Sequence, residues 1–173
     1  MPETLPTAPN DTPVSDAWQQ RVAGTMINPA TLLATDYLNH FNEVIMTIDM
    51  VPDMPELLED VKGWRLRSYA EHFKASGFDY GALAAEAYEY APPTTKRAFE
   101  ATVMQMCAVI QLALKRLQAS LALNDIDEVR RTAKAAASTL TALCGTANGI
   151  IAGARETMQQ SEIDRLLSTG STT

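Results

Sequence analysis

The chain has 173 residues, of which 46% are hydrophobic and 20% charged, a composition typical of a globular domain. It carries 14 Lys and Arg against 21 Asp and Glu, and the resulting net charge of −7 disfavours general binding to nucleic acid. No apolar run approaches the roughly 20 residues that a membrane helix needs. The first 14 residues lack Lys, Arg and an apolar core, so they do not resemble a secretory signal. Together these features predict a cytoplasmic protein that binds neither nucleic acid nor a membrane.

The N-terminal segment 1–14 contains four prolines and few large apolar side chains, so we expect a flexible arm. The first helix is predicted over 28–49, because Asn28 followed by Pro29 is typical of a helix start. Apolar side chains then recur every three or four residues, which places them on one helix face. They are Leu33, Tyr37, Phe41, Val44 and Ile48.

Three shorter helices are predicted over 55–61, 65–75 and 80–90, each ended by Gly or Pro. With the helix over 28–49 they form the predicted second region, 15–92, of N-terminal helices and a small helical cap. The stretch 41–62 carries six acidic residues against one basic residue, which is most simply a solvated acidic face.

Residues 93–158 are predicted to form a long antiparallel helical hairpin. Its first helix runs to about Leu123, Asn124 and Asp125 form the turn, and Asp125 or Asp127 can cap the second helix. Both helices repeat apolar residues at alternating spacings of three and four. The first series is Phe99, Val103, Met106, Ile110, Ala113 and Leu117; the second is Ile126, Val129, Ala133, Ala136, Leu140, Leu143, Ala147, Ile150 and Ala154.

The predicted fold is therefore all-α: an N-terminal helix and a small helical cap packed on the hairpin in a bundle-like arrangement. A lone hairpin cannot bury its own apolar faces. It can pack on the helix over 28–49 or form a homodimer through the hairpin, and the sequence is compatible with both.

Few residues suggest catalysis or metal binding. Cys107 and Cys144 lie in apolar helical stretches with no basic neighbour and are expected to pack in the core. Asp36, His40 and Glu43 share a helix face, but this order is more typical of a surface salt-bridge cluster than of a metal site. We predict no metal and no cofactor, and the sequence identifies no catalytic residue.

The tail, residues 159–173, leaves the register of the hairpin. The apolar repeat predicts apolar side chains at 157, 161 and 164, where the chain has Thr157, Ser161 and Asp164. Apolar residues reappear instead on another face, at 163, 166 and 167. We therefore predict a flexible tail with a separate short amphipathic segment, in which Ser161 can act as the N-cap.

Residues 160–170, QSEIDRLLSTG, resemble the peptide by which the flagellar motor switch protein binds the response regulator CheY. The pattern of that peptide is S-Q-x-E-I-D-x-L-L-x-x-G. The chemotaxis phosphatase CheZ carries a looser version beyond a long helical hairpin. The resemblance covers this short segment alone, and the matching residues are Glu162, Ile163, Asp164, Leu166 and Leu167.

The resemblance implies a chemotaxis or flagellar signalling protein whose tail docks a phosphorylated, CheY-like response regulator. The aliphatic side chains would enter an apolar groove and the acids would meet lysines around it. CheZ-type phosphatases use an acid followed four residues later by glutamine in the middle of the hairpin. Here Glu100 is followed by Met104, and Asp127 by Arg131, so phosphatase activity stays open.

An alternative interpretation belongs to a different class of protein. In it the chain is a non-enzymatic helical scaffold or adaptor that binds another protein through its bundle. The tail, residues 159–173, would then be a helix end that folds back on the bundle.

Overall fold

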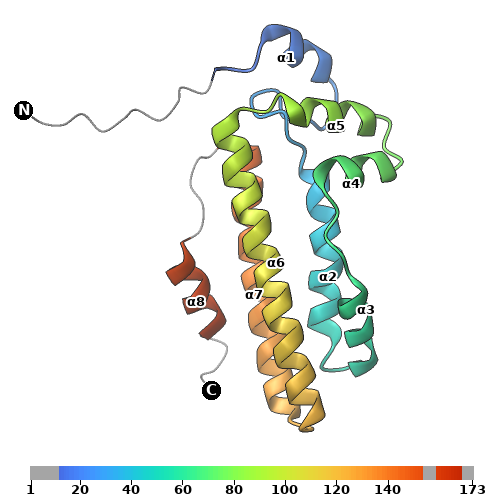
Figure 1. Cartoon of the computed structure of the whole chain (residues 1–173), viewed down its shortest axis with the longest axis vertical. Coiled ribbons are helices and arrows are strands. Elements are labelled where there is room, and N and C mark those ends of the chain that lie inside the picture. The colour runs from blue at the N-terminus through green and yellow to red at the C-terminus, as the bar shows by residue number, and fades with distance from the viewer. Residues whose placement is uncertain (1–11, 154–158, 169–173) are drawn as a thin grey trace, which may run out of the picture.

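The structure, a computed structural model, describes residues 12–153 and 159–168, and in these ranges it is built from α-helices (Figure 1). Two short 3₁₀ turns, Thr35–Leu38 and Pro55–Leu57, precede α2 and α3. Within the described ranges the β contacts are limited to one isolated bridge between Ile27 and Ala34. The all-α prediction is confirmed. The helices are α1 (Asp16–Val22), α2 (Asn39–Met50), α3 (Leu58–Gly63), α4 (Tyr69–Ala75), α5 (Gly81–Glu89), α6 (Pro93–Ala122), α7 (Ile126–Ile151) and α8 (Gln160–Ser168).

The hairpin of α6 and α7 is the longest feature of the molecule (Figure 1). Asp125 caps α7 by accepting a hydrogen bond from the Glu128 backbone N–H at 3.0 Å, as predicted. The predicted apolar series of α6 is buried throughout. In the series of α7, Ile126 is half-buried, Ala154 lies outside the described residues and all the others are buried.

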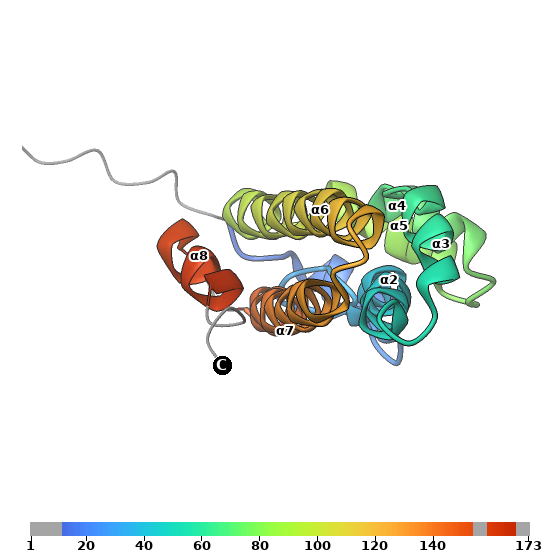
Figure 2. The ribbon, with the colours of Figure 1, turned by 90° about the horizontal axis from the view of Figure 1, so that it is seen from below.

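The helix α2 packs along α7, so the apolar faces of α2, α6 and α7 cover one another within one chain. Seen from below, α2 and α3 lie on one side of the hairpin and α8 lies on the other (Figure 2). Of the two arrangements that the sequence allows, the chain itself forms the packing on the first helix.

The predicted helix start at Asn28 is wrong. Residues 24–34 form a loop in which the Asn28 side chain accepts hydrogen bonds from the backbone N–H groups of Ala30 and Thr31, at 2.8 and 3.2 Å. Leu32 has a left-handed backbone, with φ of 58°, which no α-helix can contain. The five residues of the predicted helix face are nevertheless all buried, although Leu33 lies in the loop and Tyr37 in the 3₁₀ turn; the others are Phe41, Val44 and Ile48 of α2.

The predicted helix over 65–75 also begins later, because Ser68 and Glu71 form a capping box at its true start. Residues 64–67 instead run extended past α2. The helices over 55–61 and 80–90 are confirmed to within a few residues as α3 and α5.

The small cap is joined to the hairpin by aromatic side chains. The ring of Tyr69 stacks on Tyr88 at 4.4 Å between centroids, and Phe99 of α6 lies 5.6 Å from Tyr37 and 6.0 Å from Tyr69. The buried Tyr69 hydroxyl accepts a hydrogen bond from the Ala34 backbone N–H at 2.8 Å. The cap and the loop before α2 therefore share one core with α6.

At the N-terminal side, α1 is attached by Trp18, which packs on Tyr90 at 4.8 Å between ring centroids. Arg21 lies over the Trp18 ring and pairs with Glu86. The predicted flexible arm falls mostly on 1–11, outside the described residues. The last residue of the predicted arm, Val14, is 9% exposed and belongs to the core, so the prediction is wrong at this position.

The helix α6 is, by length and composition alone, long and apolar enough to cross a membrane, although the sequence contains no continuous apolar run of that length. In its most apolar stretch 39% of the residues are buried within the chain. Met106 and Ile110 of this stretch belong to the core shared with α7. A core helix of a soluble protein can have the same length and composition, so these two features do not distinguish a membrane-spanning helix from a core helix.

Candidate functional site

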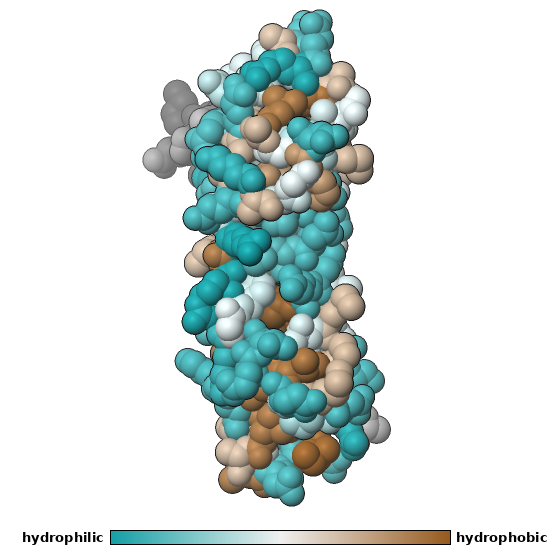
Figure 3. Space-filling model, turned by 90° about the vertical axis from the view of Figure 1, so that its right-hand side faces the viewer, coloured by the Kyte–Doolittle hydropathy of each residue, from teal (hydrophilic) through white to brown (hydrophobic). Residues whose placement is uncertain are grey.

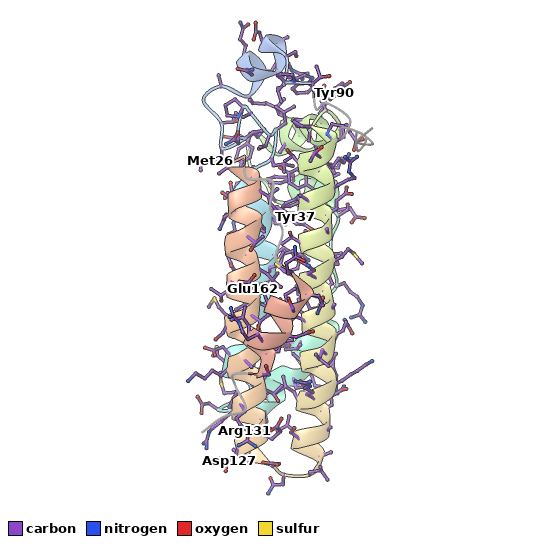
Figure 4. All side chains as sticks on the ribbon, turned by 90° about the vertical axis from the view of Figure 1, so that its left-hand side faces the viewer. Met26, Tyr37, Tyr90, Asp127, Arg131 and Glu162 are labelled. Carbon is purple, nitrogen blue, oxygen red and sulfur yellow. The ribbon has the colours of Figure 1, made fainter. Side chains whose placement is uncertain are left out.

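The segment that resembles the CheY-binding peptide forms α8, which lies across the face of the hairpin away from α2 (Figures 2 and 4). Leu167 lines a depression between the two long helices, here named the α8 groove. The α6 side is Val109, Leu112, Ala113 and Arg116; the α7 side is Glu128, Arg131, Thr132, Ala135 and Ala136.

The apolar side of α8 faces the hairpin. Ile163 is only 2% exposed and joins the hydrophobic core, while Leu166 and Leu167 are half-buried. Glu162 and Asp164 are exposed on the outer side, where Asp164 accepts a hydrogen bond from the Gln160 side chain at 2.9 Å. The structure thus divides the five predicted binding residues into an apolar side on the hairpin and an acidic side in solvent.

This packing differs from the predicted flexible tail. Residues 160–168 form a helix with a buried anchor, while 154–158 and 169–173 lie outside the described residues. Ser161 is not the N-cap, because backbone N–H groups of Glu162 and Ile163 already bond to the Gln159 carbonyl. The break before the tail is made by Gly153, whose φ of 110° ends α7 soon after Ile151.

Packing against the hairpin stabilises α8 as a helix. A helix of nine residues is too short to be stable alone in water. Burial of Ile163 contributes about 1.5–3 kcal/mol, by the usual value for a buried aliphatic side chain. Leu166 and Leu167 are only half-buried, and the cost of ordering nine residues offsets part of the gain, so a competing apolar groove can displace α8 from the hairpin.

The sequence did not predict the α8 groove, because only Ala113 and Ala136 among its lining residues belong to the apolar repeat of the hairpin. Thr132, Ala135 and Thr139 are buried although none belongs to the predicted series. Small and weakly polar side chains give little signal for burial. The second buried face of α7 is therefore evident from the folded chain and not from the sequence.

The opposite face of the molecule, formed by α2 to α5, holds the predicted acidic stretch (Figure 3). Hydrophobic side chains gather toward one end of this face among hydrophilic ones (Figure 3). Met46 and Met50 of α2 are exposed. Glu43, Glu59 and Asp60 line a depression beside Trp64. Among the described residues, no three His, Cys, Asp or Glu side chains lie close enough to hold a metal ion.

His40 does not form the predicted surface salt-bridge cluster with Asp36 and Glu43. It is buried, and its Nε2 lies 2.9 Å from the Arg65 carbonyl oxygen and 3.1 Å from the Arg67 backbone nitrogen. Nε2 can accept from the Arg67 N–H or donate to the Arg65 carbonyl, depending on where the ring carries its proton. His40 therefore holds the extended segment 64–67 on α2.

We expect stability to fall on mild acidification because of His40 and His72. Burial lowers the pKa of both imidazoles below the ordinary value of 6.5. The unfolded chain then binds protons that the folded chain excludes, so the free energy of unfolding decreases as the pH falls below about 6.5. Urea unfolding at pH 7.5, 6.5 and 5.5 measures this effect.

The variant His40→Gln/His72→Gln should lose the pH dependence between 7.5 and 5.5. The carboxyl groups of Glu71 and Glu86 have a lowered pKa through hydrogen bonds to Ser68 and Arg21, so their effect begins below the ordinary value of 4.5. An equal pH dependence in the double variant would contradict the assignment to histidine.

The cysteines lack the environment of nucleophiles. Burial raises the pKa of the Cys144 thiol to about 11 and also raises the pKa of Cys107. Asp16 and Gln20 have the acid-to-glutamine spacing of the phosphatase, but both are exposed on α1, away from the hairpin centre. The other pair with this spacing, Glu156 and Gln160, begins outside the described residues.

No protein-family model, curated protein or solved structure matches this chain. The case for any function therefore rests on the residues and on the geometry described above.

Proposed function

We propose that the chain is a cytoplasmic signalling protein of the chemotaxis or flagellar system whose α8 binds a CheY-like response regulator. The observation that carries the proposal is that residues matching the binding peptide form their own amphipathic helix. The break at Gly153 separates it from α7. Its aliphatic residues share one side and its acids the other, as a helix that enters an apolar groove requires.

The chemistry of the partner follows from α8. The partner needs an apolar groove to bind the aliphatic side chains of Ile163, Leu166 and Leu167. It also needs basic side chains at the edge of that groove to pair with Glu162 and Asp164. The acids are exposed in the docked state, so they are available for the first encounter with a basic surface. The hairpin would serve as a rigid support and, in a dimer, as an oligomerisation surface.

Titration of the full chain with a CheY-type response regulator tests the proposal. We expect binding that is tighter for the phosphorylated than for the unphosphorylated regulator. Following the phosphoaspartate over time in the same samples measures phosphatase activity directly. No binding of either form up to millimolar concentration would contradict the proposal.

The scaffold interpretation is favoured by one observation, the burial of Ile163 on the hairpin. In that case α8 is a structural part of the bundle, and a partner would bind elsewhere on it. Limited proteolysis with trypsin separates the two proposals. Cleavage after Arg165 much faster than after Arg130 supports a tail that leaves the hairpin, and equal protection supports the scaffold.

A further inference from the structure

The apolar side of α8 is already occupied in the folded chain. Ile163 is buried, and Leu167 lies in the α8 groove beside Val109 and Ala135. A helix of nine residues has one apolar stripe, and here that stripe comprises Ile163, Leu166 and Leu167. These are the side chains that would enter the groove of a response regulator.

We infer that the α8 groove and the response regulator compete for the same side of α8, so that docking on the hairpin lowers the affinity of the chain for its partner. This inference rests on the proposed function. It assigns a second role to the hairpin, which is to hold the binding helix in a resting state.

Release of α8 leaves the hairpin intact. The helix α8 lies on the side of the hairpin opposite to α2 (Figure 2), and the buried seam residues Ile110, Leu117 and Leu140 do not line the α8 groove. The apolar lining of the α8 groove consists of Val109 and Leu112 and of three small side chains, Ala113, Ala135 and Ala136, so departure of α8 exposes few large apolar side chains there. The two states therefore differ mainly in the position of α8.

The released helix needs a new apolar surface. Because α8 is too short to stay helical alone, a partner that takes it must supply a groove equivalent to the one it leaves. The apparent dissociation constant of the full chain equals the intrinsic constant divided by the released fraction. If about one chain in ten has α8 released, docking weakens binding about tenfold.

Leu112→Asp in the full chain tests the inference. Leu112 is 37% exposed and lines the α8 groove, so a carboxylate there disfavours docking without entering the core. Arg116 lies one turn further along α6 and can pair with the new Asp, which favours the helix. Met104→Asp is the matched control, since Met104 is 63% exposed on the same helix and does not line the α8 groove.

Two measurements are made on wild type, L112D and M104D. Amide hydrogen exchange of residues 160–168 without partner reports docking, and titration with a phosphorylated CheY-type regulator reports affinity. We expect faster exchange and about tenfold tighter binding for L112D, the gain expected when α8 goes from about one-tenth released to fully released. We expect no change in either measurement for M104D.

Two outcomes would contradict the inferred competition without contradicting the proposed function. One is unchanged exchange in L112D, which means that the α8 groove does not hold α8. The other is faster exchange with measurable but unchanged binding, which means that docking does not compete with the regulator. If none of the three proteins binds, the proposed function fails and the competition falls with it, whatever the exchange rates show.

Discussion

Phe99→Ala is expected to lower the free energy of unfolding by about 3–5 kcal/mol, the usual loss for a buried aromatic residue. Phe99 is 1% exposed and lies between Tyr37 and Tyr69, so its ring links α6 to the cap and to the turn before α2. Its removal leaves a cavity where three segments meet. Urea or thermal unfolding followed by circular dichroism measures the loss.

Phe78→Ala is the matched control for this prediction. Phe78 is 40% exposed between α4 and α5 and packs mainly on Tyr80, at 5.4 Å between ring centroids. The same chemical change there should cost less than about 1 kcal/mol, as expected for a partly exposed side chain. Similar losses for the two variants would mean that the aromatic cluster does not hold the cap on the hairpin.

The hairpin could be predicted from the sequence because each long helix buries one regular face against its neighbour. In α6, the residues from Phe99 to Leu117 that follow the repeat are all buried, and the turn carries its expected cap at Asp125. In a long periodic segment, single residues that depart from the pattern do not change the predicted buried face, so the pattern and the fold agree in the hairpin.

The start of α2 could not be predicted, since its determinant is the left-handed backbone of Leu32. An aliphatic residue rarely adopts that conformation, and its side chain gives no sign of it. Tertiary contacts hold this loop: Thr31 donates a hydrogen bond to the Ile151 carbonyl at 2.6 Å, and Asn28 bonds to the residues that follow it. The order Asn-Pro is equally compatible with a turn and with a helix start.

The sequence predicts the binding helix of the candidate site but not the surface on which that helix lies. The amphipathic segment and its apolar residues at 163, 166 and 167 follow from the sequence, because the break in register is visible there. Its docked position does not, because the α8 groove combines side chains of α6 and α7, several of them Ala or Thr, that have no pattern of their own. Local sequence shows that a short helix has an apolar side, but not which surface covers it.

Ile163→Ala/Leu166→Ala is expected to weaken binding of a phosphorylated CheY-type regulator to an isolated peptide of residues 159–173 by about 100-fold or more. Two truncated aliphatic anchors lose about 3–6 kcal/mol of apolar burial, and every 1.4 kcal/mol is a factor of ten in affinity. Isothermal titration of the wild-type and variant peptides measures the change.

The same double substitution in the full chain should weaken binding less than it does in the peptide. Ala at both positions also weakens docking of α8, because Ile163 is buried against the hairpin, so part of the lost affinity is offset by easier release. Leu123→Ala, at a site 80% exposed beyond the end of α6, is the control and should bind like wild type. A double variant that binds as tightly as wild type would show that any regulator contact lies outside α8. An equal loss in peptide and full chain would show that α8 binds its partner without first leaving the hairpin.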